Sequence, residues 1–180
     1  MKPQDLLKEL CACGEAVEWF DSRNPYRAWR ECKRGDWMIW LAERLNIDRN
    51  LIVTAACDCA ELSLRFVTAG EAVPKEAITV TRRWLAGKAT MEEVHAAANA
   101  AAYAADADDA AYADDAAYAA ANAAAYAAAN AAAYAAANAD DAADAARERC
   151  LENCAEITRR IIPWRQIKQA LIELGVEVAK

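Results

Sequence analysis

Seven cysteines are the side chains of this sequence best suited to chemistry, because thiolates bind metal ions and attack electrophiles. They are Cys11, Cys13, Cys32, Cys57, Cys59, Cys150 and Cys154. Cys57 and Cys59 fall in a helical pattern, where residues two apart point about 200° apart and cannot share one metal ion. Cys150 and Cys154 share a helical face but supply only two ligands. The odd number of cysteines and the lack of a leader pattern predict reduced, apolar thiols and no metal site.

The single histidine, His95, is the other candidate catalytic group. No nucleophile motif lies near it, although a pair with Cys150 or Cys154 stays open on geometry alone. The chain contains no G-x-S-x-G, P-loop, G-x-G-x-x-G or H-E-x-x-H motif. Its five glycines also disfavour a loop that cradles phosphate. We therefore expect a protein that is not an enzyme and that needs no cofactor.

A cluster of aspartates in the middle of the chain is the densest group of carboxylates. An EF-hand is excluded there, because the sixth loop position lacks glycine and no glutamate closes the loop. One interpretation is a solvated helix face that keeps an alanine-rich helix soluble. The other is a docking surface for a basic protein, in which tyrosines add contact area and carboxylates steer the partner. The predicted partner-binding residues are Asp106, Asp108, Asp109, Tyr112, Asp114, Asp115 and Tyr118.

The net charge of -7 is distributed unevenly along the chain. Residues 1–95 hold 14 basic and 15 acidic residues, and residues 147–180 hold seven basic and five acidic ones. Residues 96–146, named the acidic tract below, hold eight aspartates and no basic residue. A cationic protein, such as a toxin or another effector, is therefore the expected partner. Binding to nucleic acid or to an anionic membrane is not expected, since both require a basic face.

Four of the six tryptophans lie between positions 19 and 40. Their helical spacing favours a place in the core for Trp29, Trp37 and Trp40. As an alternative, Trp29, Arg30, Arg34 and Trp37 would form a ligand pocket, in which an indole stacks on a base and an arginine pairs with phosphate. This alternative describes an anti-defence protein of the phage type that binds a nucleotide signal or another small ligand.

Short helices joined by turns of two to five residues are expected to carry these side chains. One or two helices span 3–20, with a break at Gly14. Asn24 caps and Pro25 opens the next helix. That helix is expected to end at Gly35 in the left-handed conformation, and Asp36 is expected to cap the helix that follows.

Three further helix boundaries are predicted in the first half. Asp48 caps a longer helix that runs to Gly70. A fourth helix spans 73–86 and is closed by Gly87. Thr90 and Glu93 form a capping box that opens the next helix. The apolar stripe of the longer helix is Ile52, Ala55, Ala56, Cys59, Leu62, Ser63, Phe66 and Val67.

The acidic tract contains only Ala, Tyr, Asn and Asp, and 34 of its 51 residues are alanine. Alanine is the strongest helix former, so the tract is predicted to be helical. Tyrosine and asparagine alternate every four residues from Tyr118 to Asn138, which makes an eight-residue repeat. An unbroken helix over 91–161 would be about 105 Å long. Two or more closely packed helices are therefore favoured, with turns at Asp108–Asp109 or Asp114–Asp115.

The end of the chain returns to an ordinary amphipathic pattern. Pro163 ends one helix and starts another, whose apolar residues precede Gly175. The fold class predicted from all these elements is all-α, a multi-helix bundle or helical stack with long alanine-rich helices. Three parts are expected in one continuous folded unit: a Trp-rich short-helix bundle (1–90), a long helix or hairpin (91–162) and a C-terminal helix with a tail (163–180).

The start of the chain carries no signal-peptide pattern, and no run of apolar residues is long enough for a membrane span. We therefore expect a cytoplasmic protein. Close packing of alanine-rich helices leaves homo-oligomerisation open.

Two short motifs and the repeat resemble a known family. The motifs are C-x-R-G-D-W-M-x-W-L from Cys32 to Leu41 and W-L-x-G-x-A-T-x-E-E from Trp84 to Glu93. With the Ala/Tyr repeat that follows, they are similar to the immunity protein family, helical proteins of bacterial and phage genomes named by analogy with antitoxins encoded beside toxins. The resemblance covers nearly the whole chain. It implies a protein that binds and neutralises a toxin or another hostile effector, and it carries over no functional residues.

Overall fold

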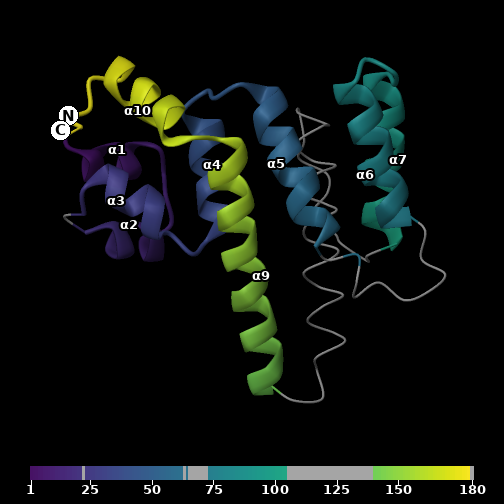
Figure 1. Cartoon of the computed structure of the whole chain (residues 1–180), viewed down its shortest axis with the longest axis horizontal. Helices are drawn as coiled ribbons and strands as arrows, with labels where there is room; N and C mark the ends of the chain where they lie inside the picture. Colours follow the sequence, from purple (N-terminus) through teal and green to yellow (C-terminus); the bar gives the residue numbers. More distant parts are fainter. Residues whose placement is uncertain (22, 63, 65–72, 105–139, 179–180) are drawn as a thin grey trace.

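The chain is all-helical in the computed structural model, which describes residues 1–21, 23–62, 64, 73–104 and 140–178 (Figure 1). No β-strand occurs within these residues. The all-α class predicted from the sequence is therefore confirmed. The described helices are α1 (Pro3–Glu9), α2 (Gly14–Phe20), α3 (Pro25–Glu31), α4 (Gly35–Arg44), α5 (Arg49–Glu61), α6 (Val73–Leu85), α7 (Met91–Ala104), α9 (Asp140–Ile161) and α10 (Trp164–Glu173).

Several helix ends follow the predicted local chemistry. The side chain of Asn24 accepts hydrogen bonds from the backbone N–H groups of Tyr26 and Arg27, at 2.9 and 3.3 Å. Asp48 accepts one from the N–H of Asn50 at 2.8 Å. These contacts satisfy donors that the first turn of a helix leaves without a partner. The predicted caps of α3 and α5 are confirmed.

The capping box of α7 also forms as predicted. The N–H of Thr90 donates to the Glu93 carboxylate at 2.7 Å, and the N–H of Glu93 donates to the Thr90 hydroxyl at 3.2 Å. Before it, Gly87 ends the α6 region with φ of +67°, a conformation that glycine adopts without steric cost.

The prediction for Gly35 and Asp36 is wrong. Helix α3 ends at Glu31, and Gly35 is the first residue of α4, outside the left-handed region. A Cβ on Gly35 would collide with the Cβ of Cys154 and lie 2.7 Å from the backbone nitrogen of Ala155. The glycine is thus required by the close approach of α9 and not by a turn. Asp36 makes no cap and pairs instead with Arg34.

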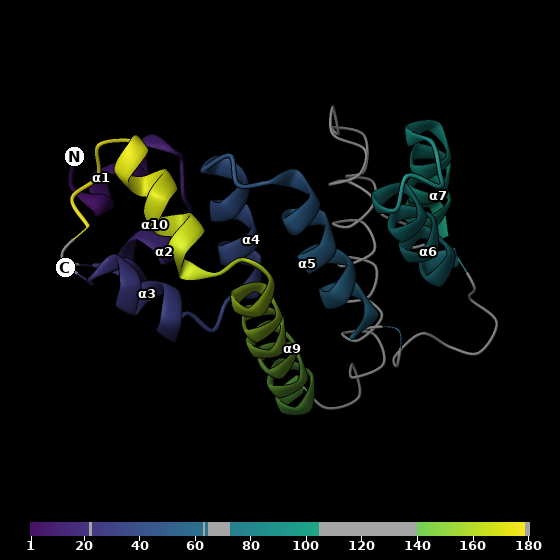
Figure 2. The ribbon, with the colours of Figure 1, turned by 45° about the horizontal axis from the view of Figure 1, so that its top comes forward.

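The helices lie in three neighbouring groups (Figure 1). Helices α1, α2, α3 and α10 gather at the end of the molecule where both termini lie. Helices α4, α5 and α9 form the middle and pack on one another, and α6 packs against both α5 and α7. Figure 2 shows the same order after the molecule is turned. The C-terminal helix therefore lies on the first helices of the chain, with α10 in contact with α3.

The two chain ends are hydrogen-bonded to each other. The amino group of Met1 donates to the carbonyl of Gly175 at 2.8 Å, and the N–H of Glu177 donates to the carbonyl of Met1 at 3.2 Å. Val176 between them is buried. The C-terminal segment thus closes one side of the group formed by α1, α2 and α3.

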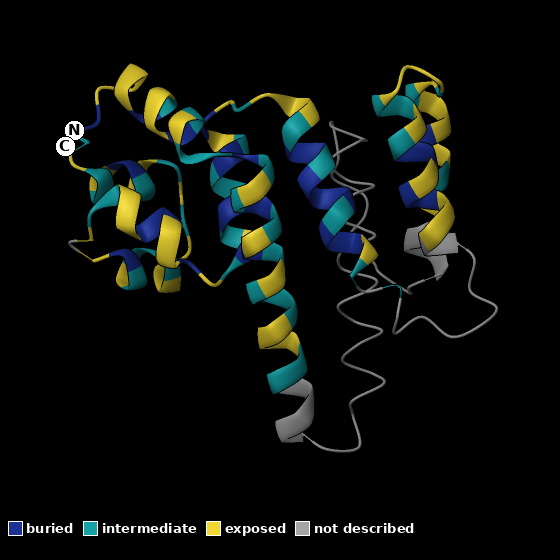
Figure 3. Ribbon diagram, in the orientation of Figure 1, coloured by how far each residue is buried: buried dark blue, intermediate teal, exposed yellow. Residues whose placement is uncertain are grey.

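Helix α5 lies between two hydrophobic cores. Ile52, Ala55 and Cys59 belong to the larger core, which includes α4, α9 and α10. The smaller core, built with α6 and α7, takes Val53, Cys57 and Ala60 from the other face of α5. Figure 3 shows buried residues along most of this helix. The single apolar stripe predicted from the sequence therefore describes only part of the buried surface.

One predicted helix end is wrong, and two predicted turns are not tested. The helix that was expected to run to Gly70 ends at Glu61, with Leu62 as its C-terminal cap. The predicted turns at Asp108–Asp109 and Asp114–Asp115 lie outside the described residues, because the structure describes 91–162 only up to Ala104 and from Asp140 onward. In the described part of the chain, no helix is both long enough and apolar enough to cross a lipid bilayer.

Candidate functional site

A cavity of about 90 Å³ lies among α1, α2, α3, α4 and α10. Its 17 wall residues are all apolar or aromatic, apart from the thiol of Cys32. Two prolines, Pro3 and Pro25, bring in the first turns of α1 and α3. Five of the six tryptophans contribute to the wall: Trp19, Trp29, Trp37, Trp40 and Trp164. The cavity therefore gathers aromatic side chains from positions 19 to 164 of the chain.

Contacts between aromatic rings of different helices, and the spacing of the tryptophans along each helix, hold the indoles in place. The rings of Trp19 on α2 and Trp37 on α4 meet with centroids 6.1 Å apart and planes tilted by 60°. Trp164 at the start of α10 packs on Tyr26 of α3, with centroids 5.5 Å apart. Tilted pairs of this kind are the geometry that aromatic quadrupoles favour. Two of the wall indoles thus contact each other, and Trp164 contacts a tyrosine that is not a wall residue.

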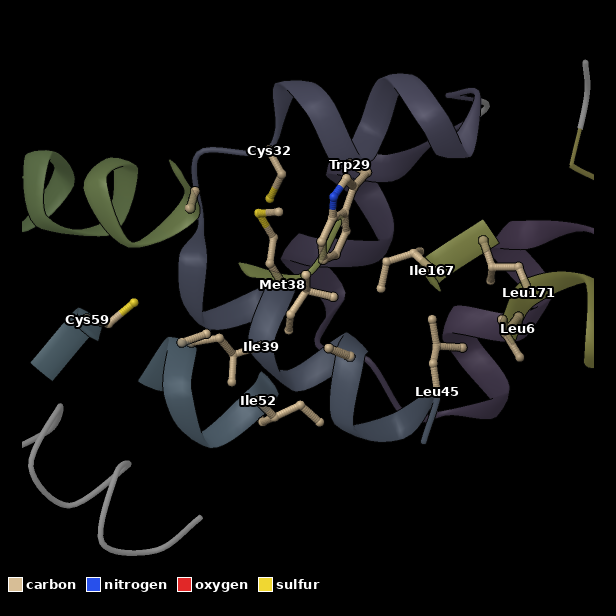
Figure 4. Packing of buried hydrophobic residues seen from close by; sticks show 14 of the residues in the cluster. Leu6, Trp29, Cys32, Met38, Ile39, Leu45, Ile52, Cys59, Ile167 and Leu171 are labelled. Atoms are coloured by element: carbon tan, nitrogen blue, oxygen red, sulfur yellow. The ribbon is translucent and has the colours of Figure 1, made fainter. Parts of the chain in front are cut away.

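Trp29 is the most deeply buried of the wall indoles, with 5% of its surface exposed. Its Nε1 is buried and has no hydrogen-bond partner among the described residues. Figure 4 shows this nitrogen on the ring edge that faces Cys32 and Met38, two other wall residues. A buried donor without an acceptor costs about 1–3 kcal/mol of folding free energy. The Trp29 indole therefore has a buried donor without a partner among the described residues, and almost none of the surface of this nitrogen is accessible.

The backbone behind Trp29 is fixed by Arg159 of α9. Its Nη1 donates to the carbonyl of Cys32 at 2.7 Å and to that of Trp29 at 3.4 Å. A cation at the C-terminal end of a helix also interacts favourably with the helix dipole. Burial raises the pKa of the Cys32 thiol, whose Sγ lies 3.5 Å from the carbonyl of Arg34. Cys32 therefore contributes a neutral, weakly polar surface to the wall.

Two of the four residues predicted for a ligand pocket line this cavity, namely Trp29 and Trp37. Arg30 is exposed and stacks on Tyr26, with its Cζ 5.8 Å from the ring centroid. Arg34 stacks on the Trp37 ring at 4.3 Å, but it is not a wall residue. The structure thus brings the predicted indoles together and leaves the predicted arginines outside the cavity.

Arg34 already has carboxylate partners. Its Nε and Nη2 donate to the two oxygens of Asp36 at 2.9 and 2.7 Å, and its Nη1 donates to Glu15 at 3.5 Å. The hydrogen bond with Asp36 raises the pKa of the Arg34 guanidinium above its ordinary value. A phosphate group would have to displace this bidentate pair in order to bind.

The second predicted site falls in a part of the chain that the structure does not describe. Asp106, Asp108, Asp109, Tyr112, Asp114, Asp115 and Tyr118 all lie outside the described residues. The arginines of α6 and α9 that form described ion pairs contact carboxylates outside the acidic tract. Arg82 of α6 contacts Asp58 at 2.7 Å, and Arg160 of α9 contacts the same carboxylate at 3.4 Å. Asp58 therefore links α5, α6 and α9.

The cysteines have structural surroundings. Cys57 and Cys59 are buried on opposite faces of α5, in agreement with the angle expected between them. Burial raises the pKa of Cys57 to about 11. A hydrogen bond with Cys150 lowers the pKa of Cys154, but a second one with Cys59 and burial outweigh it and raise this pKa to about 12. No group of three or more candidate ligands suited to a metal ion occurs among the described side chains.

His95 is exposed on α7, whereas the thiol of Cys154 is engaged with Cys59 of α5. No local pattern in the sequence indicates that Trp164 and Trp19 share a site with Trp29. The composition was the one feature of the sequence that pointed to such a site. With six tryptophans and only two phenylalanines, the chain must use indole rings at positions where most proteins have phenylalanine. Their meeting depends on the packing of α10 against α3.

These features define an all-helical protein with an aromatic cavity at one end. Comparison with protein-family models, curated proteins and solved structures finds no match for the chain.

Proposed function

We propose that this protein is a non-catalytic neutralising protein, of the immunity or antitoxin type, that binds a cationic effector protein through its acidic tract. The observation that carries this proposal is the segregation of charge. Residues 96–146 contain eight acidic residues and no basic residue, while the rest of the chain is nearly neutral. A field of one sign accelerates the encounter with a partner of the opposite sign and disfavours wrong partners.

The ion pairs of the neighbouring helices support the proposal. Arg82 and Arg160 are engaged with Asp58, and Arg83 lies 3.9 Å from Glu93. Arg159 donates to the carbonyls at the end of α3. Four arginines of α6 and α9 thus have partners outside the acidic tract. Carboxylates of the tract that are not neutralised by these arginines can meet a cationic surface.

The resemblance of the two motifs and the repeat to immunity proteins gives the proposal its biological form. A toxin such as a nuclease must contact an anionic substrate, so its active face is cationic. An acidic, tyrosine-rich segment has the charge and the aromatic side chains to occupy such a face. Neutralisation of this kind needs no catalytic group in the inhibitor.

Co-expression with the product of an adjacent toxin gene tests the proposal. We expect rescue of growth and recovery of a complex from purified components. A variant with Asp108, Asp109, Asp114 and Asp115 replaced by Asn should associate about 10–100-fold more slowly at low ionic strength, and its association rate should depend less on salt.

The matched control removes four exposed carboxylates elsewhere, by replacing Glu9, Glu18, Glu156 and Glu177 with Gln. It changes the net charge by the same amount, so a slower association that occurs equally in both variants would reflect total charge and not the acidic tract. Absence of both rescue and complex formation would refute the proposal.

A second function, binding of a small ligand, is favoured by the Trp-lined cavity. In its nucleotide form the proposal requires an arginine at the phosphate, and Arg34 would have to leave Asp36 to provide it. Calorimetry against a panel of nucleotides tests this form, and heat of binding that disappears in an Arg34→Ala variant would support it. Heat that is absent for every nucleotide would remove it.

A further inference from the structure

We propose that Cys59 and Cys154 form an oxidisable dithiol, at which a low-molecular-weight disulfide converts both thiols into one disulfide bond between α5 and α9. This modification site does not depend on the proposed effector binding, because it uses residues of the larger core and none of the acidic tract. Three features of the molecule support it: the contact between the two thiols, the placement of the neighbouring cysteines, and the length of chain that the bond would enclose.

The two thiols meet where α5 and α9 pack together. The Sγ of Cys59 lies 3.7 Å from the carbonyl oxygen of Cys154, and the two thiol groups are hydrogen-bonded to each other. In Figure 4 the Cys59 side chain points from α5 toward α9. A disulfide bond is about 2.05 Å long. Its formation therefore requires rotation of two side chains that are already in contact.

The placement of the neighbouring cysteines disfavours them as partners of Cys154. Cys57 lies on the opposite face of α5 and packs in the smaller core. Cys150 shares a face of α9 with Cys154, but Cβ atoms four residues apart on a helix are about 5–6 Å apart. A disulfide needs a Cβ separation of about 3.5–4.5 Å, so a bond between these two would distort α9. Cys59, on a different helix, is free of this restriction.

The exchange proceeds in two steps. Cys154 is partly exposed and Cys59 is buried, so the reagent reaches Cys154 first. The deprotonated Cys154 attacks one sulfur of the reagent, the S–S bond of the reagent breaks, and the released thiolate takes up the proton that Cys154 lost. The deprotonated Cys59 then attacks the Cys154 sulfur of this mixed disulfide and expels the second small thiolate, which takes up the proton of Cys59. The two protein thiols thus lose two electrons, and the reagent is reduced to two thiols.

The acidity of Cys154 affects both directions of this exchange. A hydrogen bond with Cys150 lowers the pKa of Cys154, but the hydrogen bond with Cys59 and burial outweigh it and raise this pKa to about 12. Little thiolate is present near neutral pH, so the first step is slow. A thiol of high pKa is also a poor leaving group when an external thiol attacks the finished disulfide. The bond should therefore form slowly and persist once it has formed.

The bond would enclose a long part of the chain. Cys59 and Cys154 are 95 positions apart, and α6, α7 and the acidic tract lie between them. A cross-link restricts the unfolded chain, and the effect grows with the length of the closed loop. The melting temperature of the oxidised monomer should therefore exceed that of the reduced protein by about 5–15 °C.

Cleavage at methionine identifies the bond. Cyanogen bromide cuts after Met38 and Met91, which places Cys59 in the middle fragment and Cys154 in the last one. The full chain is incubated at pH 8 with bis(2-hydroxyethyl) disulfide, which leaves methionine intact. Free thiols are then blocked with N-ethylmaleimide in denaturant before cleavage. We expect the middle and last fragments of the monomer to stay linked without reductant and to separate when reductant is added.

Four single variants assign the link to its two cysteines. Cys59→Ala and Cys154→Ala should each abolish it. Cys57→Ala and Cys150→Ala are the matched controls on the same two helices and should retain it. If a variant does not fold, tandem mass spectrometry of the linked wild-type fragments still identifies the two cysteines. Fragments that separate without reductant, a link through Cys57 or Cys150, a link found only in dimers, or an oxidised monomer that melts below the reduced protein would each overturn the proposal.

Discussion

The close approach of α4 and α9 offers a sharp test of the fold. Gly35 begins α4 at the point where α9 crosses it, and a Cβ at this position would collide with the Cβ of Cys154. The same Cβ would lie 2.7 Å from the backbone nitrogen of Ala155. Because one obstacle is backbone, no change of rotamer relieves the contact. The Gly35→Ala variant must push α4 and α9 apart or distort one of them.

The magnitude follows from two opposing contributions. Gly35 does not have a positive φ, so alanine by itself would stabilise the helix start by about 0.5–1 kcal/mol. Overpacking a close contact costs about 1–3 kcal/mol, and a backbone obstacle places this contact in the upper part of that range. The contact therefore decides the sign. We expect Gly35→Ala to lower the free energy of unfolding by about 1–2 kcal/mol.

Gly14 provides a matched control in the same chain. It also occupies the first position of a helix, α2, and has no positive φ. A Cβ added at Gly14 would meet no described atom within 4 Å. Gly14→Ala should therefore raise the free energy of unfolding by about 0.5–1 kcal/mol. Urea denaturation followed by circular dichroism at 222 nm measures both variants, and their difference should be about 1.5–3 kcal/mol.

A double variant separates the contact from helix propensity. In a Cys154→Gly background the Cβ of residue 154 is gone, so Gly35→Ala should cost less there than in the wild-type chain. Recovery should be partial because the nitrogen of Ala155 stays in place. If Gly35→Ala proves as stable as Gly14→Ala, then α4 and α9 do not approach as closely as described and the reasoning is refuted.

Three further predictions concern Arg159 and the cysteines. Arg159→Met should lower the free energy of unfolding by about 1–3 kcal/mol in urea denaturation, because the carbonyls at the end of α3 lose a charged donor; a loss no larger than that of Arg165→Met, at an exposed position of α10, would contradict it. The pKa of Cys57 is raised to about 11 in the folded protein, so the neutral thiol stabilises the fold fully below pH 9, and this contribution is lost as pH rises toward 11. At pH 10 the free energy of unfolding should therefore have fallen by about 1 kcal/mol more in the wild type than in Cys57→Ala. At pH 8 a thiol reagent should modify the exposed Cys11 and Cys13 first, as mass spectrometry of digested protein would reveal, and modification of Cys57 at the same rate would show that the smaller core opens.

Local predictions from the sequence succeeded where a side chain acts on its own neighbourhood. Asn24, Asp48 and the Thr90–Glu93 box cap the helices as expected, because a cap needs only backbone donors two or three residues away. Gly87 was predicted to close the helix over 73–86, and it follows the end of α6 with a positive φ, which is a local property. Such features depend on residues whose distance is fixed by the chain itself.

The errors arose where a distant element determined the outcome. Glycine is common at helix ends, but glycine is needed at position 35 because a Cβ there would collide with α9, more than one hundred residues later in the chain. Helix α5 has an evident apolar stripe, but only its place between two cores explains why Val53 and Cys57 are buried as well. Neither partner is visible in the local pattern.

By itself, the sequence determined the all-helical class, several helix caps and the segregation of negative charge into one tract, because these follow from propensity, from backbone donors within one turn and from composition. Only the tertiary structure decided that five tryptophans from both ends of the chain surround one cavity and that the Nε1 of Trp29 is buried without a partner among the described residues. The physical reason is that burial and hydrogen bonding depend on which helices pack together. That packing is a property of the whole chain, since α10 reaches the cavity only by folding back onto α3.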